Sequence, residues 1–545
     1  MTSRLRTILP ALVALVATGL VAPSASAAAI TFNPAQKLLG AGGGEPSIAT
    51  DQDGNVYVTG PQGIPAGVNG TTGVGLWISR DHALSFGGAK LFGSYIGGGD
   101  SDVQVLPHSK TVGILDLEAV ASDVCFSQDA GVSFTAANPA PDLTGCQLVN
   151  TGQAGPSADR EWLTLDQGGR AYVTYHEFVS AQPLIFRTDN FGNDAFTAGP
   201  CGSIISPDAL TTIEPNVPQD ITSGTLISKP VVDRQGNLYV LFTTPTQAEN
   251  VAANLQGKFS GTFSQQYLAV STDHCQSFHD HIVFDGAALG TNTVQFGDVF
   301  NDLAIDGAGN LYSVAAGFIG TQPPTSNTAN VFIFTSTDHG VTWSRPRLVT
   351  ADVGAHMLPA ATGGPLAGQL ALGYFRTTNG KTDPNDTSAR WTYTVAETQG
   401  ALNPATAAFQ FADISPGVTY HAGDICNLGL LCTTGGDRSL ADFTSATMDG
   451  DGCPIFAWAG NPPGTTGTFN YASKQATACF PTTTPTTPTT PISTSPQSPA
   501  TLPDAGTPNT SRGGLSRSLL LVLVVLLTLL LGVIPVARRL GAVRR

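Results

Sequence analysis

Charged side chains are scarce in this sequence. Asp, Glu, Lys and Arg together make up 12% of 545 residues, about half of the roughly 25% found in ordinary soluble domains. Methionine is also rare, with three residues, whereas Gly (62) and Pro (37) are abundant. So few charges argue against long surface helices, coiled coils and charged disordered tails. The many turn-forming residues instead favour numerous short strands joined by turns.

Basic residues are especially few between residues 28 and 480. This segment holds 39 of the 40 acidic residues but only 17 of the 25 Lys and Arg, a net charge of −22. Neutralising phosphates requires clustered Lys and Arg. We therefore exclude nucleic acid as the main partner.

The two ends of the chain predict export and anchoring. Residues 1–27 combine two arginines, an apolar run and a small-residue site at Ala25-Ser26-Ala27, which is typical of a secretory signal peptide. Residues 518–537 carry no charge and are long enough to span a bilayer as one helix. Four arginines in 538–545 follow, so this basic tail is expected in the cytoplasm. We expect a cell-surface protein with a single-pass anchor in the plasma membrane.

A Thr/Pro-rich stalk, residues 481–513, separates the body from the span, because such a composition cannot form a core. Within it, Leu502-Pro503-Asp504-Ala505-Gly506 resembles the cell-wall sorting signal read by sortases, with Ala505 where that signal has Thr. The resemblance implies a Gram-positive, actinobacterial envelope. Covalent wall attachment and simple membrane retention both stay open.

Eight cysteines lie in the exported body, an even number that fits disulfides. Proximity favours Cys125 with Cys146, Cys426 with Cys432, and Cys453 with Cys479, which leaves Cys201 and Cys275. No CxxC motif with partnered His occurs, so we expect no metal; no cofactor is expected either.

A strand–turn–strand pattern of the form D-x-x-G-N recurs along the body. Asp opens a tight turn, Gly or Asn takes the positive φ, and alternating Val and Tyr pack on a sheet. Clear copies begin at Asp51, Asp166, Asp233 and Asp306, a looser copy begins at Asp449, and weaker copies occupy 107–112 and 361–372. The pattern predicts seven similar hairpins.

A second pattern, S-x-D-x-G-x-x-F/W, alternates with the first. Two octets are complete, two lack only the Gly, and a degenerate copy surrounds Asp189; the four octets cover 127–134, 336–343, 79–86 and 271–278. These octets resemble Asp boxes (BNR repeats), the hairpin signature of sialidase-like β-propellers, in which Asp and Ser bind turn backbone and the aromatic packs between sheets. The resemblance covers about residues 40–480. It implies an all-β, six- or seven-bladed propeller over 28–480, and the seven hairpins favour seven blades.

The strand order places both short turns on one face, so ligand chemistry is expected on the other, where inner strands begin. Scarce arginines beside acids mark Asp159-Arg160 and Asp437-Arg438, although such pairs can equally tie neighbouring blades together. Other polar residues expected at this face are Glu45, Asp100, Asp102, Tyr175, His176, Glu177, Lys229, Asp302, His356, Arg376 and Asp442.

The resemblance to sialidases implies a carboxylate-binding arginine trio with a Tyr/Glu nucleophile pair and an Asp acid/base. Arg160, Arg376 and Arg438, with Asp437, are the candidates for substrate binding. Tyr175 and Glu177 are candidates for the nucleophile pair, and Asp159 or Asp302 for the acid/base. The family's Phe/Tyr-Arg-Ile-Pro motif does not occur, and the mature body has no arginine before Arg80.

Two hypotheses follow from these features. The first is a surface-anchored, sialidase-like glycoside hydrolase that acts on extracellular glycans, with exo-sialidase activity as one form of this hypothesis. The second is a non-catalytic propeller that binds glycan or a surface protein. We expect a monomer in either case.

Overall fold

The regular secondary structure that the computed structural model describes is entirely β-strand. The described residues are 29–40, 42–61, 74–92, 98–118, 121–134, 146–149, 158–177, 182–190, 194, 196–197, 199, 201–205, 226–244, 264–286, 294–296, 301–319, 329–350, 352–425 and 437–483. Among them, no helix is long and apolar enough to cross a membrane. The signal peptide, the span, the basic tail, the sorting-like motif and most of the stalk lie outside these residues.

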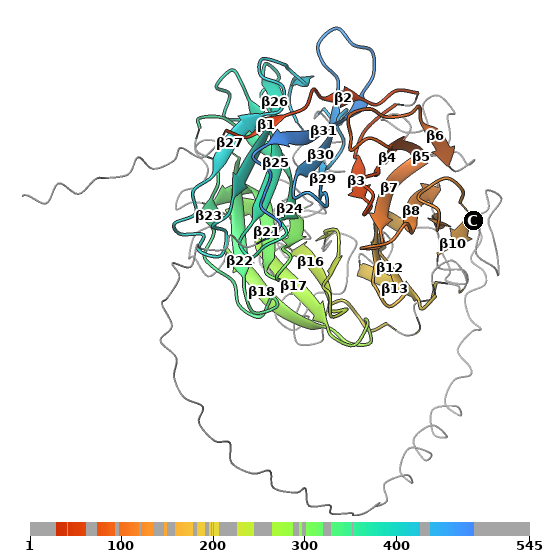
Figure 1. Ribbon diagram of the computed structural model, residues 1–545. Helices are drawn as coiled ribbons and strands as arrows, with labels where there is room; N and C mark the ends of the chain where they lie inside the picture. The colour runs from red at the N-terminus through yellow and green to blue at the C-terminus, as the bar shows by residue number, and fades with distance from the viewer. Residues whose placement is uncertain are drawn as a thin grey trace, which may run out of the picture. The chain divides into compact units, whose positions relative to one another are not determined.

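The described strands form seven antiparallel sheets arranged as the blades of a propeller (Figure 1). From the inner strand outward, blade 1 contains β3 (Ser47–Thr50), β4 (Val56–Pro61), β5 (Val74–Ser79) and β6 (Lys90–Phe92). Blade 2 contains β7 (Gly98–Val105), β8 (Val112–Glu118), β9 (Ala121–Ser127) and β10 (Gln147–Leu148). Blade 3 contains β11 (Ala158–Leu165), β12 (Ala171–Glu177) and β13 (Gln182–Thr188). The expectation of six or seven blades thus resolves to seven.

The remaining blades follow the same order, with the inner strand split in blades 4 and 5. Blade 4 contains β14 (Leu226–Ile227) and β15 (Val231–Val232), β16 (Leu238–Thr244), β17 (Gln265–Ser271) and β18 (His279–Asp285), and blade 5 contains β19 (Val294–Phe296) and β20 (Asp302–Ile305), β21 (Leu311–Ile319), β22 (Asn330–Ser336) and β23 (Arg347–Leu348). Blade 6 contains β24 (His356–Gly363), β25 (Leu370–Thr377), β26 (Arg390–Thr398) and β27 (Gln410–Asp413), with β28 (His421–Ala422) also paired to β26. Blade 7 contains β29 (Ser445–Met448), β30 (Pro454–Gly460) and β31 (Phe469–Thr477).

The ring closes in two ways. Inner strands contact one another in sequence around the channel, and β29 of blade 7 contacts β3 of blade 1. In addition, β1 (Thr31–Phe32) and β2 (Gln36–Lys37) pair with β31, so the N-terminal segment supplies the outer edge of the last blade (Figure 1). This covering of an exposed strand edge was not predicted from the sequence.

All seven predicted hairpins are confirmed as the turns between the first and second strands of the blades. In the best copies the Asp carboxylate accepts hydrogen bonds from the backbone N–H groups two and four residues later. For Asp306 these donors are Ala308 and Asn310, at 2.9 and 3.0 Å. The Gly before Asn takes a positive φ, 90° at Gly309, a conformation that costs Gly little. The Tyr312 hydroxyl also donates to Asp306, at 2.7 Å. We call these inner-strand turns.

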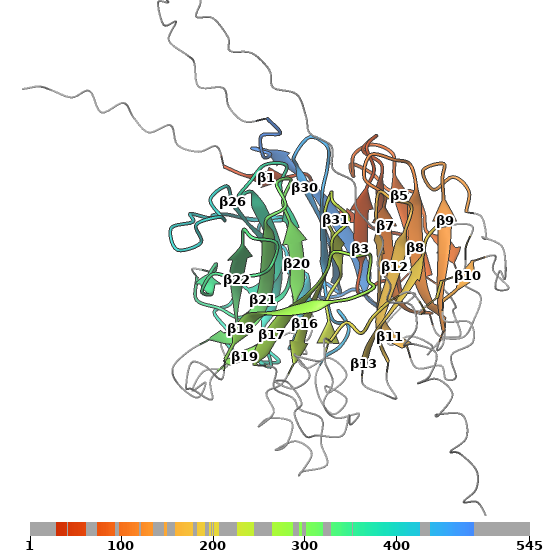
Figure 2. The ribbon, with the colours of Figure 1, turned by 90° about the horizontal axis from the view of Figure 1, so that it is seen from below.

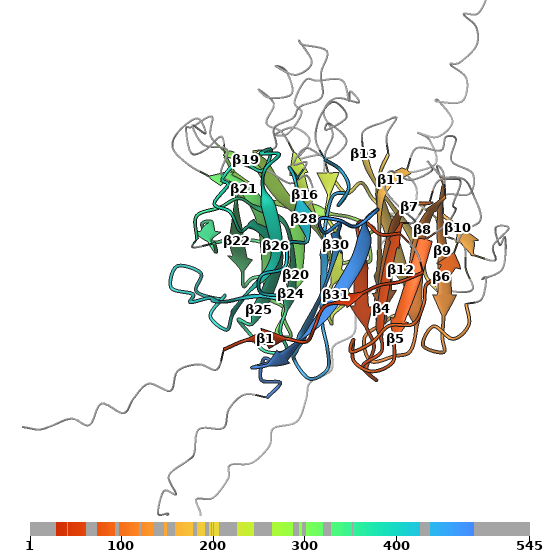
Figure 3. The same cartoon turned by 90° about the horizontal axis from the view of Figure 1, so that it is seen from above.

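The four octets form a second set of identical turns between third and fourth strands. In each, the Ser hydroxyl donates to the Asp carboxylate, which also accepts bonds from the Ser or Thr four residues after the Asp; Asp338 accepts from Ser336 Oγ (2.8 Å) and Thr342 N (2.9 Å). Octet turns lie beside inner-strand turns. For example, His339 Nδ1, in the octet turn 336–343, is 3.2 Å from the hydroxyl of Tyr239, which follows the inner-strand turn at Asp233. Both turn types therefore share one face, here called the turn face, as expected. Figure 2 and Figure 3 show the blades from the side.

Aromatic side chains fill the space between blades. Trp77, Tyr172, Tyr239, Tyr312, Trp391 and Trp458 are each fully buried. Tyr393 of blade 6 stacks on Trp458 of blade 7, with ring centroids 4.7 Å apart. The period-two pattern of the sequence thus accounts for a core shared between neighbouring sheets.

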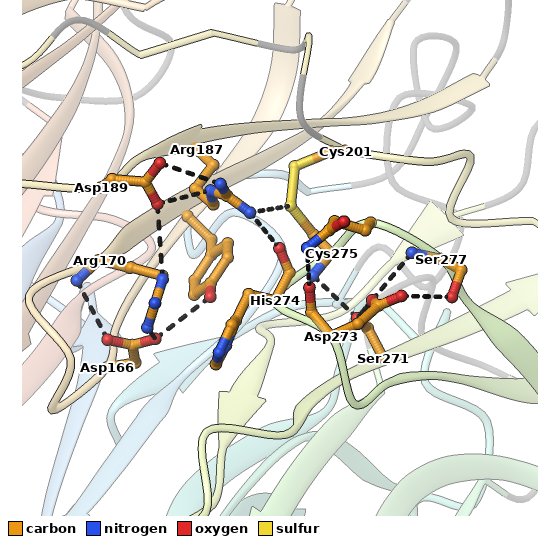
Figure 4. Close-up of a disulfide and its surroundings, with 12 residues drawn as sticks. Asp166, Arg170, Arg187, Asp189, Cys201, Ser271, Asp273, His274, Cys275 and Ser277 are labelled. Carbon is orange, nitrogen blue, oxygen red and sulfur yellow. Dashed lines mark hydrogen bonds and ion pairs between the residues drawn. A yellow bond between two sulfur atoms is a disulfide. The ribbon is translucent and has the colours of Figure 1, made fainter. Parts of the chain in front are cut away.

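Three disulfides stabilise the described part of the body: Cys125–Cys146, Cys201–Cys275 and Cys453–Cys479. Two of them are pairs that proximity favoured, and the third joins the two cysteines that were left over. Figure 4 shows Cys201–Cys275 linking the segment after blade 3 to the octet turn of blade 4, where Arg187 also donates to the His274 carbonyl at 2.6 Å. The predicted Cys426–Cys432 pair lies outside the described residues.

Candidate functional site

Each blade has one residue four positions before its inner-strand turn. We call these seven residues the tie layer; they are Ser47, Asp102, Trp162, Lys229, Asp302, Ala360 and Ser445. Several members bind the backbone of the following blade. Asp102 Oδ2 accepts from Leu163 N (2.9 Å), and Trp162 Nε1 donates to the Ile227 carbonyl (3.1 Å). The layer therefore holds neighbouring blades together.

Asp302, an acid/base candidate, belongs to this tie layer. One carboxylate oxygen accepts from Leu303 N (2.9 Å) and the other from Ala361 N of the next blade (2.8 Å). Burial raises the pKa of Asp302 to about 6, against the opposing effects of the Ala361 hydrogen bond and the Lys229 charge. Both oxygens are thus engaged, one within blade 5 and the other in joining blade 5 to blade 6.

Arg160 lies on the other side of the tie layer from the turn face. It has a positive φ of 54° at a bulge in β11, and its side chain is 2% exposed. Its guanidinium lies 4.0 Å from the centroids of both the Trp162 and Phe443 rings. Those rings come from blades 3 and 7 and meet across the channel, with centroids 5.0 Å apart.

Arg160 also pairs with two carboxylates from other blades. Nη1 is 3.2 Å from Glu45 and 3.0 Å from Asp100, and the Arg160 backbone N–H donates to Asp100 at 2.9 Å. The second arginine, Arg438, binds Asp442 at 2.7 Å, and the Asp442 N–H donates to Glu45 at 3.0 Å. We call Glu45, Asp100, Asp442, Arg160 and Arg438 the carboxyl cluster.

The environments of the cluster carboxyls drive their pKa values apart. Burial, together with the neighbouring Asp100 and Asp442 charges, raises the pKa of Glu45 well above its ordinary value. Burial would also raise the pKa of Asp100, but Arg160 and a hydrogen bond with Glu45 outweigh it and lower that pKa. Burial raises the pKa of Asp442 despite Arg438. The cluster can therefore hold a proton on one carboxyl beside an ionised one.

Access to the cluster is uneven. The side chains of Asp100 and Asp442 are 16% and 11% exposed, and that of Arg438 is 26% exposed. Arg438 Nη1 is itself buried and has no hydrogen-bond partner. Because its side chain as a whole is more exposed than that of Arg160, Arg438 is the cluster cation that a ligand reaches more easily.

The structure brings Arg160 and Arg438 into one cluster, but Arg376 has a separate set of partners. Arg376 makes two bonds to Asp413, at 3.0 and 2.6 Å, on blade 6. Asp437, next to Arg438, accepts from Ser439 N at 2.7 Å and lies 3.8 Å from His421. No described contact links Arg376 to Arg160 or Arg438.

The proposed nucleophile pair lies on β12. Tyr175 is 2% exposed and stacks on Phe186 in the core of blades 2 and 3, with centroids 5.4 Å apart. Tyr175 therefore packs within this core rather than in the carboxyl cluster, and we leave it out of the proposed site. Asp159 and Glu177 lie at the adjoining ends of β11 and β12, in register with His176 and Ala158 respectively; their side chains lie outside the described structure.

The cluster carboxyls were recognised from the sequence only as polar residues near inner-strand starts. Glu45, Asp100 and Arg160 each lie six residues before the first residue of an inner-strand turn. That equivalent spacing is the signal that could have grouped them. Phe443 occupies the same position in blade 7 but carries no charge, so its role in closing the channel had no sequence signal.

No protein-family model matches the chain, and no curated protein matches its sequence. Among solved structures, an α-L-arabinofuranosidase from Fusarium graminearum is 12% identical with a TM-score of 0.42, over 82% of this chain and 98% of that one. The NanB sialidase from Streptococcus pneumoniae is 10% identical with a TM-score of 0.37, over 81% and 70%. A protein of unknown function from Dyadobacter fermentans is 11% identical with a TM-score of 0.42, over 83% and 98%. Similarities this weak say nothing about activity, which must be argued from the site.

Proposed function

We propose that this protein is a cell-surface propeller that cleaves extracellular glycans at the carboxyl cluster. The observation that supports this most is that Glu45 and Asp100 lie against the same Arg160 nitrogen, Nη1, at 3.2 and 3.0 Å, in surroundings that raise the pKa of Glu45 and lower that of Asp100. Two carboxyls with pKa values driven apart are the arrangement that glycoside hydrolysis requires, because one must donate a proton while the other stays ionised.

In this proposal Glu45 holds the proton for the leaving oxygen, and Asp100 acts as the ionised partner that attacks the sugar or activates water. Arg160 keeps Asp100 ionised through their 3.0 Å contact. Arg438, whose side chain is 26% exposed, is the cation that a sugar hydroxyl or carboxylate would approach. A Tyr/Glu mechanism is not part of the proposal, because Tyr175 lies in the core.

The test is hydrolysis of a panel of fluorogenic aryl glycosides, including a sialoside, an α-L-arabinofuranoside and neutral hexosides, by the full-length chain. We expect Glu45→Gln and Asp100→Asn to reduce hydrolysis at least 100-fold. The control Asp386→Asn changes an acid that is paired with Lys381 and stands apart from the cluster, and should leave hydrolysis unchanged. Release of no sugar from any substrate would contradict the catalytic proposal.

Recognition without cleavage is the second candidate, and the burial of Arg160 favours it. The Arg160 side chain is 2% exposed and paired with two carboxylates. Its guanidinium is therefore not available to bind a sugar carboxylate. A glycan-binding measurement on the same chain separates the two candidates: binding that Arg438→Ala weakens, without hydrolysis, would support recognition.

Surface anchoring rests on the sequence of the two ends. Deleting 518–545 should release the protein into the medium, whether the anchor is a membrane span or a sortase-linked wall bond. Replacing Ala505 alone should matter only for a sortase mechanism. A deleted form that stays in the cytoplasm would overturn the topology.

A further inference from the structure

Both arginines of the carboxyl cluster are already paired with carboxyl groups of the protein. Arg160 Nη1 lies 3.2 Å from Glu45 and 3.0 Å from Asp100, and the Arg160 side chain is 2% exposed. Arg438 Nη2 binds Asp442 at 2.7 Å, and Arg438 Nη1 is buried. A ligand carboxylate is bound best by two parallel N–H groups of one guanidinium. Neither arginine has both terminal nitrogens available for such a pair.

Residues outside the described ranges cannot supply a further arginine. All ten arginines of 28–480 belong to the described residues, and the rest of this segment holds six acids and one basic residue, Lys258. Arg376, which the sequence grouped with Arg160 and Arg438, makes two bonds to Asp413. The body as a whole carries a net charge of −22. The supply of cations for a ligand carboxylate is therefore poor.

Asp437, directly before Arg438 in the chain, offers an acceptor instead. Its side chain is 34% exposed. Oδ1 accepts from Ser439 N at 2.7 Å, whereas Oδ2 lies 3.8 Å from His421 Nε2, which is longer than a hydrogen bond. Asp437 Oδ2 can therefore accept a hydrogen bond from a ligand.

The accessible groups of the site favour a hydroxyl over an anion. Asp100 and Asp442 are 16% and 11% exposed, so a ligand that approaches Arg438 also meets carboxyl groups. A sugar hydroxyl can donate to a carboxylate and also accept from a guanidinium, whereas a sugar carboxylate can only accept. A further negative charge beside these acids is unfavourable.

We propose that the carboxyl cluster and Asp437 select a neutral sugar, which carries hydroxyls but no carboxylate, and that Asp437 sets this preference. The preference rests on the proposed function, because it concerns the same site, and it applies equally to cleavage and to recognition. Asp437 Oδ2 accepts from one sugar hydroxyl, and Arg438 donates to another. A sialoside or a uronide brings its own carboxylate to a site where Asp437 and Asp442 already lie.

Two pairs of sugars that differ only at C6 test this preference: D-galactose with D-galacturonate, and D-glucose with D-glucuronate. Saturation-transfer NMR titrations on the full-length chain, purified in a detergent without sugar headgroups, measure their affinities. We expect at least one neutral sugar to bind, with its uronate partner weaker by about tenfold or more. The preference should persist in about 0.5 M NaCl, which screens the net charge of the body.

Three variants assign the preference to residues. Asp437→Asn keeps an oxygen for Ser439 N but removes the charge, so it should narrow the advantage of the neutral sugar over its uronate by about tenfold. Asp442→Asn removes the carboxylate that occupies Arg438 Nη2 and should strengthen uronate binding, a gain that a folding defect does not produce. The control Asp386→Asn, whose acid is paired with Lys381 apart from the cluster, should change neither affinity.

The proposal is overturned if a uronate binds as tightly as its neutral partner, if no sugar of either pair binds, or if Asp437→Asn leaves the preference intact. It is also overturned if the preference disappears at high salt, because the net charge of the body would then be its cause. The same pairs as 4-methylumbelliferyl glycosides, with a sialoside, separate this preference from cleavage. Binding of neutral sugars without release of any aglycone contradicts hydrolysis alone. Fastest release from a uronide or the sialoside supports hydrolysis and overturns the preference.

Discussion

At the residue scale, the two arginines of the carboxyl cluster differ in what surrounds them. Arg160 is sandwiched between two rings and paired with Glu45 and Asp100, whereas Arg438 binds Asp442 and keeps one nitrogen unpaired. The alternative that such arginines tie blades together fits the contacts of Arg160. Arg438 fits the ligand-binding role better.

Replacing each arginine by Lys should separate these roles. Arg160→Lys keeps the charge but loses the planar group between the rings, so we expect unfolding to become easier by about 2–3 kcal/mol, toward the cost of breaking a buried pair. Arg438→Lys should leave the melting temperature nearly unchanged and weaken glycan binding. Thermal unfolding and binding, measured on both variants, check this; equal thermal losses in the two would make both arginines structural.

Glu397 permits a second prediction at this scale, which concerns pH. It is 3% exposed, and burial raises its pKa to about 7 despite the Gln475 hydrogen bond at 3.2 Å. The unfolded chain loses this proton near pH 4.5, whereas the folded chain keeps it until about pH 7. Stability from this group is therefore present at low pH and is lost as pH rises through that window.

The variant Glu397→Gln removes that titration. We expect it to gain on the wild type by on the order of 2–3 kcal/mol between pH 4.5 and pH 8, measured by denaturant unfolding. Asp386→Asn serves as a control of opposite sign, because hydrogen bonds from Ser388 and Lys381 lower the pKa of Asp386 to about 2. Its stability difference from the wild type should instead shrink as pH falls below 4. If the stability difference between Glu397→Gln and the wild type does not change with pH, the Glu397 carboxyl does not contribute to the pH dependence of stability.

At the element scale, the two turn types differ in the hydrogen bonds that their Asp residues make. The octet-turn Asp338 binds only residues of its own turn, Ser336 and Thr342. The inner-strand-turn Asp306 also accepts a bond from Gly368 N of the next blade, at 2.9 Å. The inner-strand turn at Asp306 thus helps to join neighbouring blades, whereas the Asp338 carboxylate bonds only within its own turn.

We therefore expect Asp306→Ala to destabilise the protein more than Asp338→Ala does. The losses should be about 3–5 kcal/mol and about 1–2 kcal/mol, since each lost bond costs near 1 kcal/mol and the Tyr312 hydroxyl is left buried without its acceptor. Denaturant unfolding of both variants measures this. Neither should lose ligand binding selectively; a variant with normal stability and no binding would contradict the assignment of chemistry to the face opposite the turns.

At the scale of the whole molecule, sequence reasoning succeeds where the repeat carries the information. The D-x-x-G-N spacing determines five of the seven hairpins, because the Asp carboxylate and the positive-φ Gly act locally. The candidate site is less well predicted from the sequence. Trp162 and Phe443 meet across the channel from distant parts of the sequence, and no local pattern marks such a contact. Likewise, Asp302 looks like a catalytic acid in sequence, and only its bond to Ala361 of the next blade shows that it joins blades.

Ring closure is the least predictable feature, since β1 and β2 are two residues each. Their attachment is nevertheless extensive. Leu38 is 1% exposed and its N–H bonds the Asn470 carbonyl at 2.9 Å, and Lys37 Nζ lies 3.4 Å from the centroid of the Phe469 ring. Without this segment β31 becomes an open edge with unpaired backbone groups.

Deleting residues 29–38 should therefore lower the melting temperature and promote association through β31. Loss of Leu38 alone accounts for about 2–5 kcal/mol on the scale of large-to-small core changes, and the exposed strand edge then pairs with a second copy. A matched deletion of ten stalk residues, 490–499, should change neither property, because the stalk composition cannot form a core. Thermal unfolding and size-exclusion chromatography of the two deletions decide the matter. If the 29–38 deletion melts and elutes like the stalk deletion, the ring is held closed by the inner-strand contacts of β29 with β3 alone, and the N-terminal strands are dispensable.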